Sequence, residues 1–568
     1  MKLALFALWL ALAVAPDAVM RIAGLEGLFA VLAYLALLGW SVVGLVAAAF
    51  IPQNLLRWVL AALFAFAAFF ASTVAAITGD FLTYDAFINL VGSTGFAGDA
   101  LRQYGSAFLA PLVLSIVLLF ALGLPPQMRF SLPRFTVAIP LAVVASITAL
   151  LFMRAGDGAR GLPASYPAMS YAALYAGESI VNPRRPREEP ALPLAEQPGR
   201  HVVLVIDESI AGHYLDFNDP DGVATPLTGP LGEVQLANFG VVPAITNCSV
   251  GSNLALRFGG TRKNYTETIA SGPSIWAYAK AAGLRTVYID AQRTDGALHN
   301  AMTQDELALI DSFIQFDDVA VLDRDLAAAE RLAAELESPR PSLILVNKVG
   351  AHFPVHDKFP DSHMTYRPVL PRGGWSDVSD TGSREGFDGS AESWRRYRNS
   401  YRNALSWNVG AFFERLLTLA DLSSTVLIYT ADHGQDLEVQ DDVRLSTHCN
   451  SNPRVSEGAV PLLTLSADPR WQVPTSALGE GSHYRIMPTL LQLMGYEPRA
   501  VEARYGPALT STAAEPDTFN ARFNARLGQS PDWRSISEGG LSNPVALDSG
   551  TGPREPQTRA RRQRSPQR

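Results

Sequence analysis

Long apolar stretches dominate the first 154 residues of the chain. They lie near residues 2–20, 27–50, 56–78, 106–124 and 134–153. A membrane-spanning helix needs about 20 apolar residues, so we expect residues 1–154 to form a transmembrane domain of five helices. Lys2 and the apolar run after it could instead mark a signal peptide. Pro16 and Asp17 interrupt that run and further spans follow at once, which favours a retained first helix.

Charges in the loops predict the orientation of these helices. Arg57 follows the second stretch, and Arg129 and Arg134 follow the fourth, whereas the loop 79–105 is acidic. Positive residues favour the cytoplasmic side, so the chain beyond residue 154 is expected outside, which is the periplasm in a Gram-negative cell. The pattern predicts a multi-pass inner-membrane protein. The loop 79–105 is amphipathic in places, so it either lies on the bilayer surface or simply connects two helices.

The second half of the chain alternates short apolar runs with helical patterns. Residues 155–200 are rich in Pro, Arg and Glu and are expected to form a linker. Continuous apolar runs, typical of strands buried on both faces, lie at 202–206, 286–289, 343–346, 425–429 and 461–465, and helical patterns lie at 272–283, 324–337, 392–420 and 483–494. We therefore expect residues 201–505 to form an α/β domain with a mostly parallel sheet flanked by helices.

Composition narrows the class of protein. Of 568 residues, 48% are hydrophobic and only 18% are charged, with a net charge of −8, which excludes a disordered chain and a typical nucleic-acid binder. Two cysteines exclude a disulfide-rich scaffold or a cysteine-based zinc module. Residues 506–568 are expected to form a disordered basic tail. Its cluster Arg559–Arg564 could touch anionic lipid or nucleic acid, but a solvated end is the simpler interpretation.

Carboxylates and a histidine follow two of the predicted strands. Asp207 and Glu208 end the run 202–206, and Asp432 and His433 follow the run 425–429. Parallel sheets carry their chemistry at the carboxyl ends of their strands, and zinc accepts both carboxylate and imidazole ligands. A helix N-cap is the structural alternative for Asp207. The pattern predicts a metal site.

Other polar positions at element ends complete the candidate site. His352, His448 and His483 lie at such ends, and we expect function of His352 and His448 more than of His483, His356 or His363. Residues 246–253 form a polar loop that enters a helix. A hydroxyl or thiol at a helix N-terminus gains from the macrodipole and from free N–H groups that also hold phosphate or sulfate. A capping cluster is the alternative.

Together these motifs resemble the alkaline phosphatase superfamily, in its sulfatase-like branch, and most closely the inner-membrane phosphoethanolamine transferases that modify lipid A. Residues 204–209 (LVIDES) are similar to the family's first strand, and 430–434 (TADHG) to its metal motif. The resemblance implies one or two zinc ions, with Glu208, Asp432, His433 and the nucleophile as ligands. It also implies that His352 and His448 contact phosphate or a second zinc.

The nucleophile segment departs from the family pattern. The transferases use Thr, and sulfatases use Cys or Ser followed by Pro-Ser-Arg, whereas this chain reads CSVGS at 248–252. Both groups place a small residue three positions after the nucleophile, so counting back from Ser252 indicates Ser249, with Cys248 and then Thr246 as alternatives. The family's disulfides are absent. If the fold is right, Cys248 and Cys449 both line the site, and we predict that they form a bridge.

The resemblance implies transfer of phosphoethanolamine from phosphatidylethanolamine to a lipid or glycan acceptor, such as lipid A, through a covalent phospho-Ser249. A sulfatase and a glycerol-phosphate transferase are alternatives on the same fold. A non-catalytic membrane protein is a further alternative from another class. The polar insertion at about 370–392 either shapes the choice of acceptor or forms a plain loop.

Overall fold

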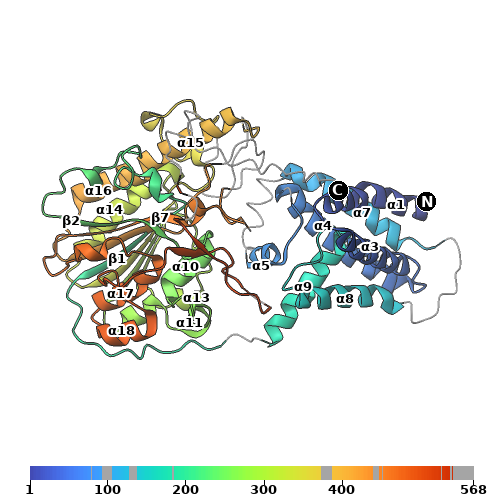
Figure 1. Cartoon of the computed structure of the whole chain (residues 1–568), viewed down its shortest axis with the longest axis horizontal. Helices are drawn as coiled ribbons and strands as arrows, with labels where there is room; N and C mark the ends of the chain where they lie inside the picture. Colours follow the sequence, from blue (N-terminus) through green and yellow to red (C-terminus); the bar gives the residue numbers. More distant parts are fainter. Residues whose placement is uncertain are drawn as a thin grey trace, which may run out of the picture. The chain divides into compact units, whose positions relative to one another are not determined.

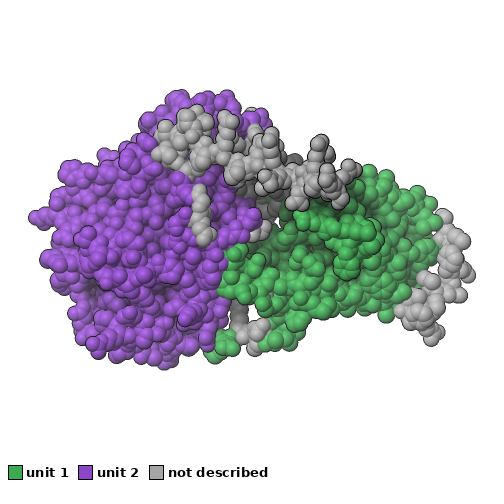
Figure 2. Space-filling view, viewed as in Figure 1, with its two compact units in different colours: residues 1–187, 379–383, 522–532 green, residues 188–378, 384–521, 533–568 purple. Residues whose placement is uncertain are grey.

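The computed structural model describes residues 1–78, 80–92, 105–126, 137–181, 185–372, 387–438, 447–450, 452–525, 527–537 and 540–541. The chain divides into two compact units (Figures 1 and 2). Among the described residues, unit 1 comprises residues 1–187 and 522–532, and unit 2 comprises the rest. Residues 79 and 93–104 of the loop 79–105, most of the insertion at 370–392 and the whole cluster Arg559–Arg564 lie outside the described residues.

Unit 1 is helical. Its helices are α1 (Lys2–Trp9), the π-turn η1 (Leu10–Val14), α2 (Ala15–Ala23), α3 (Leu28–Ala49), α4 (Asn54–Thr78), α5 (Tyr84–Gly92), the 3₁₀ turn η3 (Gly105–Phe108), α7 (Leu109–Gly123), α8 (Ile139–Met153) and α9 (Ser165–Val181). Three stretches are long and apolar enough to cross a membrane: Lys2–Ala23, Leu28–Ala49 and Asn54–Ile77. The helices α7 and α8 are apolar but have only 15 residues each. The structure thus confirms apolar N-terminal helices and leaves the count of five spans a prediction.

Helix α9 lies in the segment expected to be a linker. It packs against α4 and α8, and it buries Tyr166 and Tyr171. The Tyr166 ring meets the Phe64 ring of α4 edge to face, with centroids 5.2 Å apart. These apolar contacts make residues 165–181 part of the helical unit, so the first part of the predicted linker is folded.

Unit 2 is built on a seven-stranded sheet in the order β2-β7-β6-β1-β5-β3-β4. The strands are β1 (His201–Asp207), β2 (Gln235–Pro243), β3 (Arg285–Asp290), β4 (Ser312–Ile314), β5 (Ser342–Asn347), β6 (Thr425–Ala431) and β7 (Ala459–Ser466). β1 runs parallel to β5 and β6, whereas β7 is antiparallel to its neighbours β6 and β2. Every residue of β1, β5 and β6 is buried, which confirms the predicted mostly parallel sheet.

Helices cover both faces of this sheet (Figure 1). α14 (Arg324–Leu336) packs against α16 (Phe412–Leu419), which continues from α15 (Ala391–Leu405) through the π-turn η10 (Ser406–Ala411). On the other face lie α10 (Ser249–Phe258), α11 (Tyr265–Ser271), α12 (Ile275–Ala281), α17 (Ile486–Leu493) and α18 (Pro498–Tyr505), with α13 (Gln304–Leu307) beside them. Because helices cover both faces of the sheet, we expect the functional side chains at the ends of the strands.

The predicted disordered tail is folded over its first part. β8 (Thr518–Asn520) pairs with β9 (Trp533–Ser535) in a separate two-stranded sheet. Phe519 is fully buried and packs against Ala459 and Ile536. Part of the chain beyond the expected boundary at residue 505 is therefore ordered, because a few apolar residues in a polar segment suffice to dock it. Residues 542–568 lie outside the described part of the chain.

Candidate metal centre and nucleophile

The register of two central strands brings the candidate ligands together. Asp207 of β1 pairs with Ala431 of β6, so the residues that follow, Glu208 and Asp432, leave the sheet side by side. The backbone N–H of Ser209 donates to Asp432 Oδ1 at 3.0 Å and ties the two strand ends together. The side chains of Glu208, Asp432 and His433 are buried, and each offers a ligand atom within 4.8 Å of the others.

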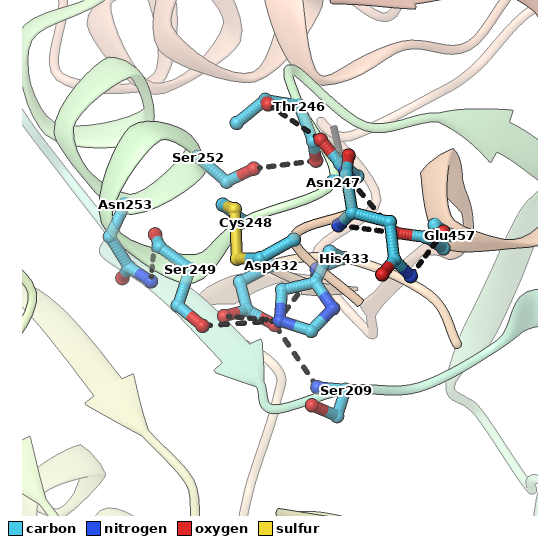
Figure 3. Close-up of a disulfide and its surroundings, with 12 residues drawn as sticks. Ser209, Thr246, Asn247, Cys248, Ser249, Ser252, Asn253, Asp432, His433 and Glu457 are labelled. Carbon is cyan, nitrogen blue, oxygen red and sulfur yellow. Dashed lines mark hydrogen bonds and ion pairs between the residues drawn. A yellow bond between two sulfur atoms is a disulfide. The ribbon is translucent and has the colours of Figure 1, made fainter. Parts of the chain in front are cut away.

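Ser249 completes this cluster from the start of α10 (Figure 3). Its Oγ lies 3.1 Å from His433 Nε2 and 3.3 Å from Glu208 Oε1. His433 Nε2 in turn lies 3.4 Å from Glu208 Oε1 and 3.7 Å from Asp432 Oδ2. Three oxygens from three residues therefore surround one imidazole nitrogen. His433 Nδ1 donates to the carbonyl of Gly434 at 2.7 Å. In the neutral ring the proton is therefore on Nδ1, and Nε2 presents its lone pair to the three oxygens.

The carboxylates of Glu208 and Asp432 repel each other unless a cation lies beside them. Burial, together with the adjacent charge of Glu208, raises the pKa of Asp432 to about 7. Burial alone would lower the pKa of His433, but the carboxylates of Asp432 and Glu208 raise it to about 9. Burial also opposes ionisation of Glu208, yet hydrogen bonding to His433 and the nearby charge of His352 hold its pKa well below the usual range. The site thus favours positive charge beside Glu208.

A divalent metal fits these residues. Among the described residues, Asp432 Oδ2 is buried and accepts no hydrogen bond, and such a carboxylate oxygen is costly unless a proton or a metal meets it. Two carboxylate oxygens, an imidazole nitrogen and a hydroxyl form a donor set that suits zinc. Glu208, Asp432, His433 and Ser249 are therefore the residues that could hold a metal.

The three nucleophile candidates occupy different positions. α10 begins at Ser249, with Cys248 as its extended N-cap residue. Cys248 is bonded to Cys449 in a disulfide, so its sulfur is not a free thiol. Thr246 Oγ1 lies 3.4 Å from Asn247 Oδ1 and is directed away from the cluster. Of these candidates, the structure brings the Ser249 hydroxyl to the metal ligands.

His448 lies beside the cluster on the segment 447–450. The disulfide attaches this segment to the start of α10, and the N–H of Cys449 donates to the carbonyl of Asn247 at 3.0 Å. The carboxylate of Glu457 accepts from the side-chain amides of Asn247 and Asn450, both at 2.9 Å. These contacts hold His448 close to His433 (Figure 3 shows the disulfide and Glu457).

His352 follows β5 at the same edge of the sheet. Its Nδ1 lies 2.8 Å from the carbonyl of Phe353 and donates to it. Its charge contributes to the low pKa of Glu208. The three-residue metal cluster includes neither His352 nor His448, so their contact with phosphate or a second metal stays a prediction.

The remaining histidines are outside this cluster. His483 Nδ1 accepts the N–H of Ile245 at 3.3 Å, and its Nε2 lies 2.9 Å from Thr430 Oγ1. Burial lowers the pKa of His483 to about 3, so the ring is a neutral link between the 3₁₀ turn that precedes α17 (His483–Arg485), β6 and the segment after β2. The His363 ring meets Trp407, with centroids 4.5 Å apart, and His356 is fully buried near Phe353.

Several contacts around the ligands were not predicted from the sequence. Successive strand residues face opposite sides, so Asp207 turns away from Glu208. It pairs instead with the buried ammonium of Lys348 and with the Tyr429 hydroxyl. Ser209 Oγ donates to Glu208 Oε1 at 2.9 Å, and Gln292 Nε2 donates to Glu208 Oε2 at 3.0 Å. The sequence signal for Gln292 is its position shortly after the apolar run 286–289, because residues after a buried strand lie at the edge of the sheet that carries the site.

Comparisons with known proteins bear on the family and the fold of this chain. The sequence model of the Sulfatase family matches residues 200–496. No curated protein matches the chain at a significant level. Among solved structures, the integral membrane protein lipooligosaccharide phosphoethanolamine transferase A from Neisseria meningitidis is similar, with a TM-score of 0.56 and 15% identity, over 89% of this chain and 98% of that one. At this identity the likeness shows a shared fold.

Two further structures cover a smaller share of the chain. The C-terminal periplasmic domain of EcEptC from Escherichia coli, in complex with zinc, has a TM-score of 0.46 and 17% identity, over 61% of this chain and 97% of that one. Phosphonate monoester hydrolase of Agrobacterium radiobacter has a TM-score of 0.39 and 14% identity, over 56% and 79% of the two chains.

Proposed function

Because the chain belongs to the Sulfatase family, we propose that it is a zinc-dependent transferase that moves phosphoethanolamine from phosphatidylethanolamine to a lipid or glycan acceptor, through a phospho-Ser249 intermediate. One observation carries the proposal. The Ser249 hydroxyl lies within 3.3 Å of both Glu208 and His433 at the first turn of α10, in a chain with three apolar helices long enough to span a bilayer.

Each residue of the site has a distinct task in this proposal. Glu208, Asp432 and His433 would hold zinc, and Ser249 would join them as the fourth ligand. When bound, zinc lowers the pKa of a coordinated hydroxyl and offsets negative charge on phosphoryl oxygens. The N-terminus of α10, which begins at Ser249, favours the same negative charge. His352 and His448 are the proposed phosphate contacts, or ligands of a second zinc.

The reaction proceeds in two balanced steps. Ser249 Oγ forms a bond to phosphorus as the bond from phosphorus to the diacylglycerol oxygen breaks, and diacylglycerol leaves with a proton. Ser249 gives up its proton to His448 or His352, which passes it to the diacylglycerol oxygen as a general acid. An acceptor hydroxyl or protonated phosphate then attacks phosphorus and gives its proton to the same histidine, which returns it to Ser249 Oγ as the bond from that oxygen to phosphorus breaks. The second step regenerates the starting protein.

Membrane-embedded substrates explain the apolar helices. Donor and acceptor lipids stay in the bilayer, so an enzyme that acts on both must stay beside it. We propose an inner-membrane location with unit 2 in the periplasm, where a disulfide can persist. A sulfatase or a glycerol-phosphate transferase is the second candidate, since the Sulfatase fold serves several esters. The missing Pro-Ser-Arg after Cys248 weakens the sulfatase reading. The cluster of Glu208, Asp432 and His433 argues against the non-catalytic alternative.

A donor assay tests the proposal. Detergent-purified full-length protein is incubated with phosphatidylethanolamine, with phosphatidylglycerol or with an aryl sulfate, and the released diacylglycerol or sulfate is measured. We expect diacylglycerol from phosphatidylethanolamine, and none from the Ser249→Ala variant. Turnover of phosphatidylglycerol alone would make the chain a glycerol-phosphate transferase, and sulfate release would make it a sulfatase. No turnover of any ester by zinc-loaded protein would favour the non-catalytic alternative.

A further inference from the structure

Gln292 has a buried side-chain amide that contacts the proposed metal ligand Glu208 at the carboxylate oxygen that does not face the cluster. It follows β3 by two residues and is 2% exposed. Its Nε2 donates to Glu208 Oε2 at 3.0 Å and to the carbonyl of Lys348 at 2.8 Å. Because β3 lies two strands from β1 in the sheet, Gln292 reaches Glu208 across the end of β5. Both of its amide hydrogens are therefore used.

The orientation of this amide is fixed from the other side. His299 Nδ1 lies 2.6 Å from Gln292 Oε1. An amide oxygen only accepts, so His299 is the donor in this bond. The backbone N–H of Gln292 donates to Asp290 Oδ1 at 3.0 Å and anchors the turn after β3. With its oxygen toward His299, Gln292 must present its NH₂ group to Glu208.

The two oxygens of Glu208 consequently have different surroundings. Oε1 faces the cluster and lies 2.9 Å from Ser209 Oγ, 3.3 Å from Ser249 Oγ and 3.4 Å from His433 Nε2. Oε2 faces the amide of Gln292. A buried carboxylate oxygen needs such a donor, because an unmatched one loses its hydration without compensation. Gln292 meets this need without adding charge.

From this geometry we propose that Gln292 is a positioning residue, which reserves Glu208 Oε1 for the metal and restrains the carboxylate from turning. The inference rests on the proposed zinc site. Without the amide, Oε2 would turn toward the cation, and the ligand would lose its fixed direction. Hydrogen-bond partners of metal ligands typically change metal affinity 10- to 100-fold when they are removed. We expect the same of Gln292.

The test compares Gln292→Met with a matched control, Gln315→Met. Gln315 Nε2 also donates to a carboxylate and a carbonyl at the same edge of the sheet, Asp290 Oδ2 at 3.0 Å and Ala297 O at 2.9 Å, but it does not contact Glu208. Zinc affinity of the full-length protein in detergent is measured by competition with a chromophoric chelator. The absorption spectrum of the Co²⁺-substituted protein reports ligand geometry.

We expect the zinc dissociation constant to rise about 10- to 100-fold in Gln292→Met, with a changed Co²⁺ spectrum, and to stay at the wild-type value in Gln315→Met. Equal affinity and equal spectra for wild type and Gln292→Met would overturn the inference. Wild-type protein that binds no zinc would instead overturn the proposed function.

If Gln292→Met does not fold, His299→Phe decides the question, because it removes the donor that orients the amide and leaves Gln292 in place. We expect a smaller but measurable loss of zinc affinity in this variant. An unchanged dissociation constant would count against the positioning role.

Discussion

The imidazole rings of His433 and His448 lie almost parallel, with centroids 4.4 Å apart and planes inclined by 19°. His433 belongs to the end of β6, whereas His448 belongs to a short segment attached to the start of α10. The stack places a second imidazole next to the ring that contacts Ser249. His448 is therefore in reach of the phosphoryl group that Ser249 would carry.

His448 should serve proton transfer more than metal binding. We expect His448→Ala to lower kcat by about 10²- to 10⁴-fold, the usual contribution of a general acid or base. Because His448 is outside the three-residue metal cluster, zinc content should stay at the wild-type value. Steady-state kinetics and metal analysis of the same preparation check both points. A loss of zinc that parallels the loss of activity would make His448 a ligand instead.

The disulfide should stabilise unit 2. It joins residues 201 positions apart, and closing a long loop constrains the unfolded chain, so removing a disulfide typically costs about 2–5 kcal/mol. We expect the double variant Cys248→Ser/Cys449→Ser to unfold at lower temperature than wild type in detergent. Dithiothreitol should lower the wild-type midpoint and leave the double variant unchanged. Equal midpoints for wild type and variant would contradict the prediction.

Buried strands were predictable from the sequence because burial on both faces leaves a continuous apolar run. The runs 202–206, 286–289, 343–346, 425–429 and 461–465 all lie within strands of the sheet. β2 was missed. It is an edge strand, largely half-buried, with Asn238 and Gly240 in its middle, so it has no such run. The short strands β4, β8 and β9 have three residues each, which is too few for a pattern.

The part of the candidate site that lies directly after the strands was predictable from the sequence. Glu208, Asp432 and His433 follow β1 and β6 directly, so their meeting follows from parallel pairing. Which of two adjacent acids faces the site depends on the exact end of the strand. The pattern alone therefore does not separate Asp207 from Glu208, and only the family resemblance indicated Glu208. Gln292 reaches Glu208 by a turn whose path only tertiary packing defines.

Glu457 should make stability depend on pH. Burial raises its pKa to about 7, against hydrogen bonds from Asn247 and Asn450 that oppose the shift. An acid whose pKa is higher in the folded state binds more protons there, so its contribution to stability falls as pH rises from about 4.5 to about 7. At about 1.4 kcal/mol per unit, the change amounts to about 3 kcal/mol.

The Glu457→Gln variant checks this pH dependence, because its amide has nearly the same shape and does not titrate. Its single oxygen replaces only one of the two carboxylate oxygens that accept hydrogen bonds, which lowers the stability of the variant by an amount independent of pH. The stability of wild type relative to the variant should decline between pH 4.5 and 7 and then level off. Thermal unfolding at several pH values measures the difference. A constant difference across this range would show that Glu457 does not titrate as described.

His483 should be structural. Its ring bridges the N–H of Ile245 and the hydroxyl of Thr430. Because Thr430 also donates to the carbonyl of Pro461, His483→Ala leaves the buried N–H of Ile245 without its acceptor, at a cost of about 1–3 kcal/mol. We expect a lower unfolding temperature with kcat of the folded fraction unchanged. His352→Ala should show the opposite pattern, with lower kcat at near-normal stability. Reduced kcat in fully folded His483→Ala would assign it to the catalytic site.

The central claim is that Ser249 accepts the phosphoethanolamine group. Detergent-purified protein is incubated with phosphatidylethanolamine without acceptor, quenched in acid and digested. The mass of the peptide that contains Ser249 is then measured by mass spectrometry. We predict a phosphoethanolamine adduct on Ser249 that is absent from Ser249→Ala and disappears when acceptor is added. An unmodified Ser249 in protein that cleaves the donor, or an adduct on another residue, would contradict the account.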